Sequence, residues 1–186
     1  RETKGELYME KTRKTVVINR NRGSVSYVIP DMNNLKRDFL PGAKKELTVE
    51  ELFALSQLPG GMFELKHYLE IQDPEIAQYI LEENVEPEYF YTEEDIKKLL
   101  TSGTLAQFED FLNFAPKGRI DIAQQMAVDL PLNDVAKRDL FLKKTGFDIA
   151  TAISMKDEVN VAVNAPKRKA QPITKPIERK ATPITK

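Results

Sequence analysis

The residue types that could support catalysis are few and widely spaced in this chain of 186 residues. There is no cysteine, which excludes thiolate chemistry, disulfides and cysteine-rich zinc sites. His67 is the only histidine, so any histidine-dependent acid–base scheme would have to use it. Its neighbours are Lys66 and Tyr68, and no Ser or Asp lies at a diagnostic spacing. We therefore interpret His67 as an ordinary surface or half-buried residue.

Acidic residues are concentrated in one stretch that offers oxygen ligands of the kind that magnesium and calcium prefer. Its members are Glu82, Glu83, Glu86, Glu88, Glu93, Glu94 and Asp95. The stretch lacks the D-x-D-x-D-G spacing of a calcium loop and crosses the turn at Pro87. We interpret it as a solvated acidic face, and a metal-dependent enzyme built on it is the third functional hypothesis. The sequence predicts no cofactor and no small-molecule substrate.

Charge is divided unevenly along the chain. From Asn164 onward there are seven Lys or Arg and one Glu, so the preceding 163 residues carry a formal charge of −7, against −1 for the whole chain. With 41% hydrophobic residues, the acidic part can form a globular core. No apolar run approaches the roughly 18 residues that a membrane span needs, and the N-terminus lacks the signal-peptide pattern. We expect no membrane partner.

The basic C-terminal segment contains a short repeat. R-K-A-Q-P-I-T-K, ending at Lys175, returns eleven positions later as R-K-A-T-P-I-T-K, ending at Lys186. Four prolines oppose both helix and regular strand pairing, so we expect an extended, disordered tail that is free to reach a partner. The candidate partner-binding residues are Lys167, Arg168, Lys169, Pro172, Ile173, Lys175, Arg179, Lys180, Pro183, Ile184 and Lys186.

The chemistry of this tail favours one class of partner slightly. Each copy offers one isoleucine and no aromatic residue for base stacking, so a protein groove or an edge strand is favoured over single-stranded nucleic acid. Two equivalent copies would gain from effective concentration. Solvated disorder without a partner remains the alternative.

The N-terminal part has the pattern of a small α+β module. Residues 15–18 and 25–29 are rich in β-branched and aromatic residues, and turn residues separate them, which predicts a β-hairpin. In the second strand Val25, Tyr27 and Ile29 share one face, which we expect to be buried. Residues 37–40 are a candidate third strand.

Helix signals follow these strands. Thr48 and Glu51 have the spacing of a capping box and predict a helix of about nine residues. Residues 62–71 suit a helix in their first half and a strand in their second. Asp73 before Pro74 predicts a helix that reaches about Glu83.

The C-terminal part of the body reads as a bundle of short helices. Caps are predicted at Thr92, Thr104, Asn133 and Asp148, with Gly146 as a left-handed helix end. The helix after Asn133 carries Lys137, Arg138, Lys143 and Lys144, which are the candidate nucleic-acid contacts. The alternation of Val159, Val161 and Val163 allows two interpretations, an edge strand or an ordered start to the linker.

These elements predict an α+β fold with four parts. They are a flexible leader (1–13), a small module with a β-hairpin or three strands and short helices (14–85), a compact helical bundle (86–155) and a disordered basic repeat tail (156–186). The leader is polar, and within it we exclude the residues through Tyr8 from the fold, with Met9 as a candidate native start.

Four phrases in the body carry a family resemblance. They are E-P-E-Y (86–89), F-L-N-F-A-P (111–116), L-P-L-N-D-V-A-K-R (130–138) and T-G-F (145–147). These phrases resemble a group of uncharacterised proteins encoded by tailed bacteriophages, over roughly Thr15 to Ile153 and without the tail. The group has no assigned site to transfer. The resemblance implies a phage context, with a virion or assembly component or a small host-directed factor located in the virion or the host cytoplasm.

The leading hypothesis is therefore a non-catalytic phage structural or assembly-associated protein, tethered to a protein assembly through its repeat tail. The alternative is a nucleic-acid-binding regulator that uses the tail and the helix at 134–145. A sequence-specific helix-turn-helix is disfavoured because Asp134 and Asp139 would oppose phosphate contacts.

Overall fold

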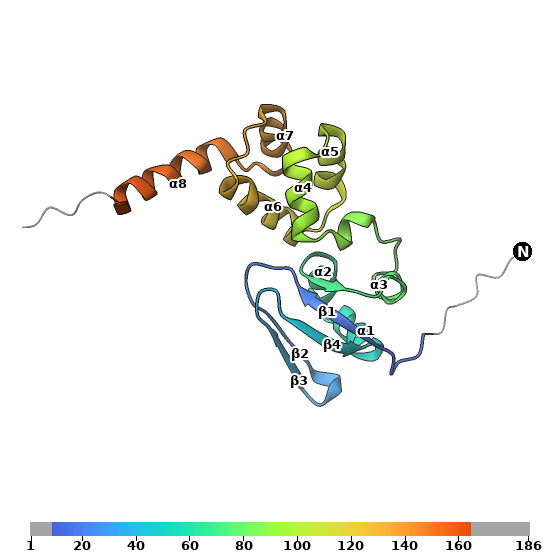
Figure 1. Ribbon diagram of the computed structural model, residues 1–186. Helices are drawn as coiled ribbons and strands as arrows, with labels where there is room; N and C mark the ends of the chain where they lie inside the picture. Colours follow the sequence, from blue (N-terminus) through green and yellow to red (C-terminus); the bar gives the residue numbers. More distant parts are fainter. Residues whose placement is uncertain (1–8, 165–186) are drawn as a thin grey trace, which may run out of the picture.

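The computed structural model describes residues 9–164, which form an α+β fold of two packed modules (Figure 1). The N-terminal module contains β1 (Lys14–Asn19), β2 (Val25–Ile29), the 3-10 turn η1 (Pro30–Met32), β3 (Leu35–Phe39), β4 (Lys44–Thr48), α1 (Val49–Gln57), α2 (Gly61–His67), β5 (Leu69–Ile71) and α3 (Pro74–Leu81). The helical module contains α4 (Glu93–Ser102), α5 (Leu105–Phe114), α6 (Lys117–Asp129), α7 (Val135–Thr145) and α8 (Ile149–Asn164). The 3-10 turn η2 (Pro87–Phe90) connects the modules.

Two sheets form the β part, and their pairing differs from the predicted hairpin. β1 is the central strand of an antiparallel sheet ordered β4-β1-β5, whereas β2 pairs only with β3. The prediction that residues 15–18 pair with residues 25–29 was wrong, because alternation shows which face of a strand is buried but not which strand lies beside it. The expected burial in β2 is confirmed at Val25 and Ile29, with Tyr27 partly buried.

The tight turn of the module lies in a different place from the expected one. Asn33 and Asn34 both adopt the left-handed conformation, with φ of 58° and 56°, and they join β2 to β3 through η1. Asparagine tolerates this region better than most residues. After β1, the Asn19 amide instead donates to the carbonyl oxygens of Gly23, Phe39 and Leu40 and so holds a wider loop.

Helix starts in the first module follow local side-chain capping. The Asp73 carboxylate accepts from the backbone N–H groups of Glu75 and Ile76 ahead of α3, as predicted. Residues 62–71 are helix in their first part and strand in their second, which settles that ambiguity.

The predicted capping box at α1 forms only on one side. The Thr48 hydroxyl accepts from the N–H of Glu51, but the Glu51 carboxylate is 3% exposed and accepts two bonds from Arg37 at 2.8 and 2.9 Å. The Tyr27 hydroxyl donates to the same carboxylate, and burial together with that negative charge raises the pKa of Tyr27. Glu51 therefore fastens the β2–β3 hairpin to α1.

The helical module confirms most of the expected caps. Thr92 with Asp95 and Thr104 with Gln107 form complete capping boxes, and Gly146 ends α7 with φ of 75°. The cap of α7 is Asp134, one residue after the predicted Asn133.

The last helix was not predicted at its full length. α8 continues to Asn164, so the valines at 159–163 lie in a helix and not in a strand, and the predicted start of the tail at residue 156 was too early. Figure 1 shows α8 leading away from the N-terminal module. Residues 165–186, which include every candidate residue of the repeat tail, lie outside the described residues.

Two separate cores account for the modules. Buried apolar residues from Met9 to Tyr89 form the first core, and those from Ile96 to Ile149 form the second. Since Tyr89 belongs to the first core, the division falls a few residues after the predicted boundary at 85.

Candidate functional site

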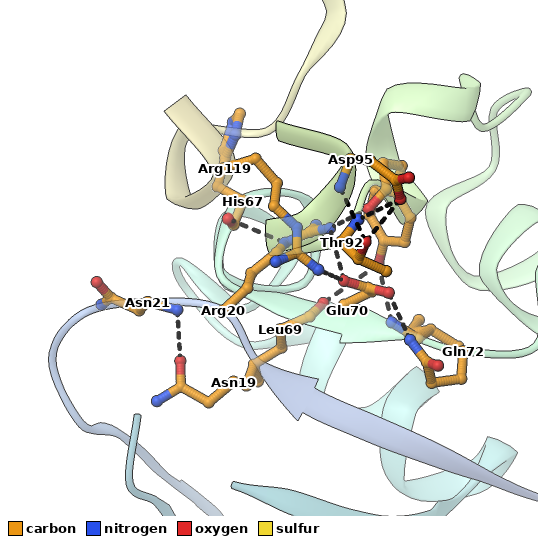
Figure 2. A network of polar contacts seen from close by, with 12 residues as sticks. Asn19, Arg20, Asn21, His67, Leu69, Glu70, Gln72, Thr92, Asp95 and Arg119 are labelled. Carbon is orange, nitrogen blue, oxygen red and sulfur yellow. Dashed lines mark hydrogen bonds and ion pairs between the residues drawn. The ribbon is translucent and has the colours of Figure 1, made fainter. Parts of the chain in front are cut away.

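Three buried charged residues lie where the two modules meet (Figure 2). Arg20 directly follows β1, Glu70 lies in β5, and Arg119 lies in the first turn of α6. Their side chains are 0%, 3% and 9% exposed. Clusters of buried ionisable groups often mark active sites, so this junction cluster is the first candidate.

Arg20 is committed entirely to internal contacts. Its guanidinium donates to the carbonyl oxygens of Lys66 at 2.7 Å, His67 at 3.2 Å and Tyr89 at 2.7 Å. It also lies 4.0 Å from the centre of the Tyr89 ring, within the range of a cation–π contact. Burial lowers the pKa of Arg20 to about 10, although Tyr89 and Glu70 oppose that change. All three nitrogens of the Arg20 guanidinium donate to backbone carbonyls within the fold.

Within residues 9–164, Glu70 is the only carboxylate paired with the two guanidiniums of the junction cluster. It accepts a hydrogen bond from Arg119, lies 3.8 Å from Arg20, and accepts a second hydrogen bond from the Gln72 amide. Within residues 9–164, the Nε of Arg119 is buried without a hydrogen-bond partner. Removing a single member of such a buried pair is costly, because it leaves an uncompensated charge in a poorly polarisable interior.

Tyr89 completes the junction from the connecting segment. Its hydroxyl accepts from the N–H of Ile71 at 3.0 Å and lies 3.2 Å from the carbonyl oxygens of Leu65 and Leu69. Burial raises the pKa of Tyr89. The side chain therefore ties η2 to α2 and β5.

A close approach of α6 to the N-terminal module completes the contact between the modules. A Cβ added at Gly118 would lie 2.8 Å from the carbonyl oxygen of His67 and 2.9 Å from that of Arg20. The Nδ1 atom of His67 accepts from the N–H of Lys117 at 3.3 Å. Burial and the nearby cations lower the pKa of His67, which favours the neutral imidazole that this acceptor role requires. His67 is partly buried, as predicted.

The hydrogen bonds and ion pairs of the junction cluster hold the two modules together. A cavity of about 430 Å³ lies beside the cluster, with walls that include Arg20, Arg22, Glu93 and Arg119. The Arg20 and Glu70 side chains are 0% and 3% exposed, and the Arg119 side chain, at 9%, is the least buried of the three. Their hydrogen bonds join β1, β5, α6 and η2 into one unit.

The candidate nucleic-acid residues of α7 are mostly engaged within the fold. Lys137 is 3% exposed, and its ammonium donates at 3.0 Å to the carbonyl oxygens of Leu99 and Leu100 at the end of α4. The expected contact of Lys137 with phosphate is therefore corrected, because its ammonium is buried against carbonyl oxygens at the C-terminal end of a helix, where the helix dipole favours a cation. Arg138 donates to the Leu132 carbonyl and to Asn133. Lys144 donates to Asn113 at 2.8 Å, and Lys143 is exposed.

The acidic stretch does not gather into a metal site. Glu82 ends α3 in the left-handed conformation, Glu83 pairs with Lys66 at 3.0 Å, and Asp95 is held in its capping box. Within residues 9–164, no three carboxylate or imidazole groups lie close enough together to hold an ion.

An open apolar groove on the N-terminal module is the second candidate site. It has a volume of about 480 Å³ and lies among α1, α3, η1 and the first described residues. Its walls are Met9, Lys11, Ile29, Asp31, Met32, Val49, Glu50, Phe53, Ala54, Gln57, Leu58 and Tyr79. Phe53 and Tyr79 are 48% and 37% exposed. We call this feature the α1 groove.

Sequence reasoning missed both candidate sites. Arg20 lies in a segment with turn chemistry, and nothing in its spacing pointed to Glu70 or Arg119. Phe53 directly follows Leu52 in an apolar stretch, and the sequence alone does not separate a core residue from one that borders a groove. In the structure Leu52 is fully buried, whereas Phe53 is turned toward the α1 groove.

Comparison of the chain with protein-family models, with curated proteins and with solved structures found no match. Over the part of the chain that the structure describes, no helix is both long enough and apolar enough to cross a membrane.

Proposed function

We propose that this protein is a non-catalytic, assembly-associated binding protein of a tailed phage, held in a protein assembly by its α1 groove and its basic repeat tail. The observation that carries the proposal is the contrast between the two candidate sites. At the junction, Arg20 and Glu70 are buried and bonded to other groups of the fold. The α1 groove, in contrast, presents exposed aromatic and apolar side chains.

The composition of the α1 groove suits a protein partner. Aromatic residues and methionine are enriched in the cores of protein interfaces, and the groove contains Phe53, Tyr79, Met9 and Met32. Lys11, Asp31 and Glu50 provide charge at the groove. An apolar centre with charged residues around it is the usual arrangement of a protein-binding surface.

The phage context rests on the four sequence phrases that resemble phage proteins. It makes a virion or an assembly intermediate in the host cytoplasm the expected location. The opposite charges of body and tail support attachment to another acidic surface, and such attachment weakens as salt rises.

Nucleic-acid binding through α7 is less well supported by the geometry. Lys137 and Arg138 donate to backbone carbonyls, so little of the helix's positive charge is free for phosphates. The basic residues of the tail could still bind phosphates. Nuclease treatment during affinity purification separates such nucleic-acid binding from protein binding.

The test is affinity purification of the full chain from infected cells, with and without residues 165–186, each split into nuclease-treated and untreated samples. We expect phage structural proteins to co-purify with the full chain after nuclease treatment, and fewer to do so without the tail. Partners that disappear after nuclease treatment would overturn the proposal in favour of nucleic-acid binding.

A matched pair of groove variants completes this test. Phe53→Ser alters the α1 groove, and Phe63→Ser alters an aromatic residue on α2 that is also 48% exposed but lies outside the groove. Loss of the same partners with Phe53→Ser alone supports the α1 groove as a binding site. Equal retention by both variants would remove the groove from the proposal.

A further inference from the structure

We propose that the α1 groove receives the Pro-Ile-Thr-Lys segment of the repeat tail from a second copy of this chain. The inference rests on the proposed function, and it identifies the partner of the groove as the protein itself. Each chain would then offer one groove and two matching segments, Pro172 to Lys175 and Pro183 to Lys186.

The floor and walls of the α1 groove suit a small apolar side chain. Ile29 and Val49 are 1% and 2% exposed and lie at its base, while Phe53 and Tyr79 are partly open to solvent at its walls. A branched side chain such as that of Ile173 or Ile184 would bury apolar surface on both partners. Binding of the isoleucine would also shield the Phe53 side chain from water.

The α1 groove would contact a ligand through side chains and not through backbone hydrogen bonds. This suits the repeat, because its prolines lack a backbone N–H. The groove is formed mainly by the side chains of two helices and a turn, not by the open edge of a strand. A ligand that added to a strand edge would need its backbone N–H groups, and proline lacks one. Pro172 and Pro183 therefore cost little in a groove of this kind, and a fixed φ reduces the entropy lost on binding.

Charge at the α1 groove complements the lysine that ends each repeat. Within residues 9–164, Asp31 makes no ion pair, and Glu50 meets only Lys11, at 3.9 Å with both side chains more than half exposed. Such exposed contacts are weak and easily exchanged. Lys175 and Lys186 each follow the repeat isoleucine by two residues. When the isoleucine occupies the α1 groove, the lysine therefore lies near the carboxylates of Asp31 and Glu50.

The direction of α8 favours a groove on another molecule. α8 packs against α6 and α7 in the helical module and leads away from the N-terminal module that holds the α1 groove (Figure 1). Ile173 lies nine positions after Asn164, a stretch that spans at most about 30 Å. Two segments on one tail can engage the grooves of two neighbours, which strengthens a larger assembly through effective concentration.

The test measures self-association of the full-length protein by sedimentation velocity over a range of concentrations at low ionic strength. We expect the wild-type protein to form dimers and larger species as its concentration rises. Phe53→Ser, which changes the groove, and the double variant Ile173→Ser with Ile184→Ser, which changes the tail, should each weaken association by at least tenfold.

Mixing these two variants separates binding between copies from binding within one chain. The Phe53→Ser protein keeps an intact tail, and the tail variant keeps an intact groove. If the tail of one copy enters the groove of another, the mixture recovers a dimer that neither variant forms alone. Failure of the mixture to recover a dimer would overturn the inference.

Two controls match the test variants in chemistry. Phe63→Ser removes an equally exposed aromatic residue outside the groove, and Ala170→Ser with Ala181→Ser alters both repeats without touching their isoleucines. Both should associate like the wild-type protein. The tail variants change no residue of the described fold, so their effect cannot come from a misfolded body.

The outcome also separates this inference from the proposed function. A wild-type protein that stays monomeric at high concentration overturns the inference, and leaves residues 1–8 or another phage protein as occupants of the groove. If phage structural proteins still co-purify through Phe53 in that case, the proposed function stands without self-association. Loss of both results would reject the two proposals together.

Discussion

The junction cluster and the α1 groove use their side chains in opposite ways. At the junction, two arginines, one glutamate and one tyrosine are buried and bonded to backbone carbonyls or to one another. At the α1 groove, Phe53 and Tyr79 line the open space and remain partly exposed. The buried charged residues are therefore concentrated at the junction between the modules, whereas exposed apolar surface lies at the α1 groove.

This difference shows that the buried charges of this fold join its two modules. The cluster resembles an active site in burial and in residue types, but most of its donors bond to acceptors of α2, β5 and η2. The comparison predicts that junction variants lose stability, whereas groove variants lose association.

The largest effect is expected at Glu70. The change Glu70→Gln leaves the buried guanidiniums of Arg20 and Arg119 without their carboxylate, so it should lower the free energy of unfolding by about 3–5 kcal/mol. Urea denaturation at pH 7 measures the change. The control Glu83→Gln breaks an exposed ion pair with Lys66 and should cost about 1 kcal/mol or less.

A double variant sharpens this result. Adding Arg119→Gln to Glu70→Gln removes one of the two unpaired charges, so part of the lost stability should return. If Glu70→Gln costs no more than its exposed control, the junction does not depend on the buried charges, and the comparison fails.

The next effect concerns the close approach of the modules. Gly118→Ala places a methyl group against the backbone carbonyls of His67 and Arg20, so α6 must shift, and we expect a loss of about 1–3 kcal/mol. Thermal unfolding followed by circular dichroism measures it. Gly23→Ala is the matched control, because its added Cβ meets nothing nearer than the Asn21 amide at 3.8 Å. Equal melting temperatures for the two variants would contradict the tight packing at Gly118.

Tyr89 is expected to have a somewhat smaller effect. In Tyr89→Phe the ring stays, but the N–H of Ile71 loses its acceptor in a buried site, at a cost of about 1–2 kcal/mol. Chemical denaturation measures this loss. The control Tyr68→Phe changes a partly buried tyrosine whose hydroxyl makes no hydrogen bond within residues 9–164. A loss no greater than that of the control would show that water replaces the hydroxyl.

Asp95 gives a prediction for acid. The Thr92 hydroxyl and N–H donate to its carboxylate and lower the pKa of Asp95 from its ordinary value of 3.8, so the ionised form is favoured in the folded state. This contribution is present above pH 3.8 and disappears as the pH falls through the lower folded value. Asp95→Asn should therefore destabilise the protein at pH 6 and make a smaller difference at pH 2.5.

Unfolding curves at both pH values test the sign of this effect. Asp121→Asn is the control, because that carboxylate makes no hydrogen bond or ion pair within residues 9–164. A difference between Asp95→Asn and wild type that grows in acid would contradict the capping role.

The smallest change in stability is expected at the α1 groove. Phe53→Ser replaces a side chain that is about half exposed, so the unfolding free energy should change by about 1 kcal/mol or less. Its neighbour Leu52 is fully buried, and Leu52→Ala should cost about 2–5 kcal/mol. A severe loss of stability with Phe53→Ser would make the groove part of the core and would remove the distinction between the two regions.

Local features of the fold were well predicted, and longer-range ones were not. The caps at Thr92, Thr104 and Asp73 depend on a side chain and on N–H groups two or three residues away, so a short stretch of sequence determines them. The partner of β1 was mistaken because β4 and β5 lie some 25 to 50 residues further along the chain.

The charged residues show the same limit at the level of single side chains. The sequence alone suggests that Lys137 is a surface lysine, but α4 places two backbone carbonyls within reach of its ammonium. Glu51 reads as half of a capping box until the β2–β3 hairpin brings Arg37 to it. Burial of an ion is decided by partners that are distant in sequence.

The sequence by itself determined the α+β class, most helix starts, the opposite charges of body and tail, and the repeat that ends the chain. These follow from composition, from periodicity and from contacts over a few residues. Only the tertiary structure decided which charged groups are buried at the junction and that Phe53 borders an open groove. Those outcomes depend on how the two cores pack, because pairing and exposure are properties of the assembled surfaces and not of any one segment.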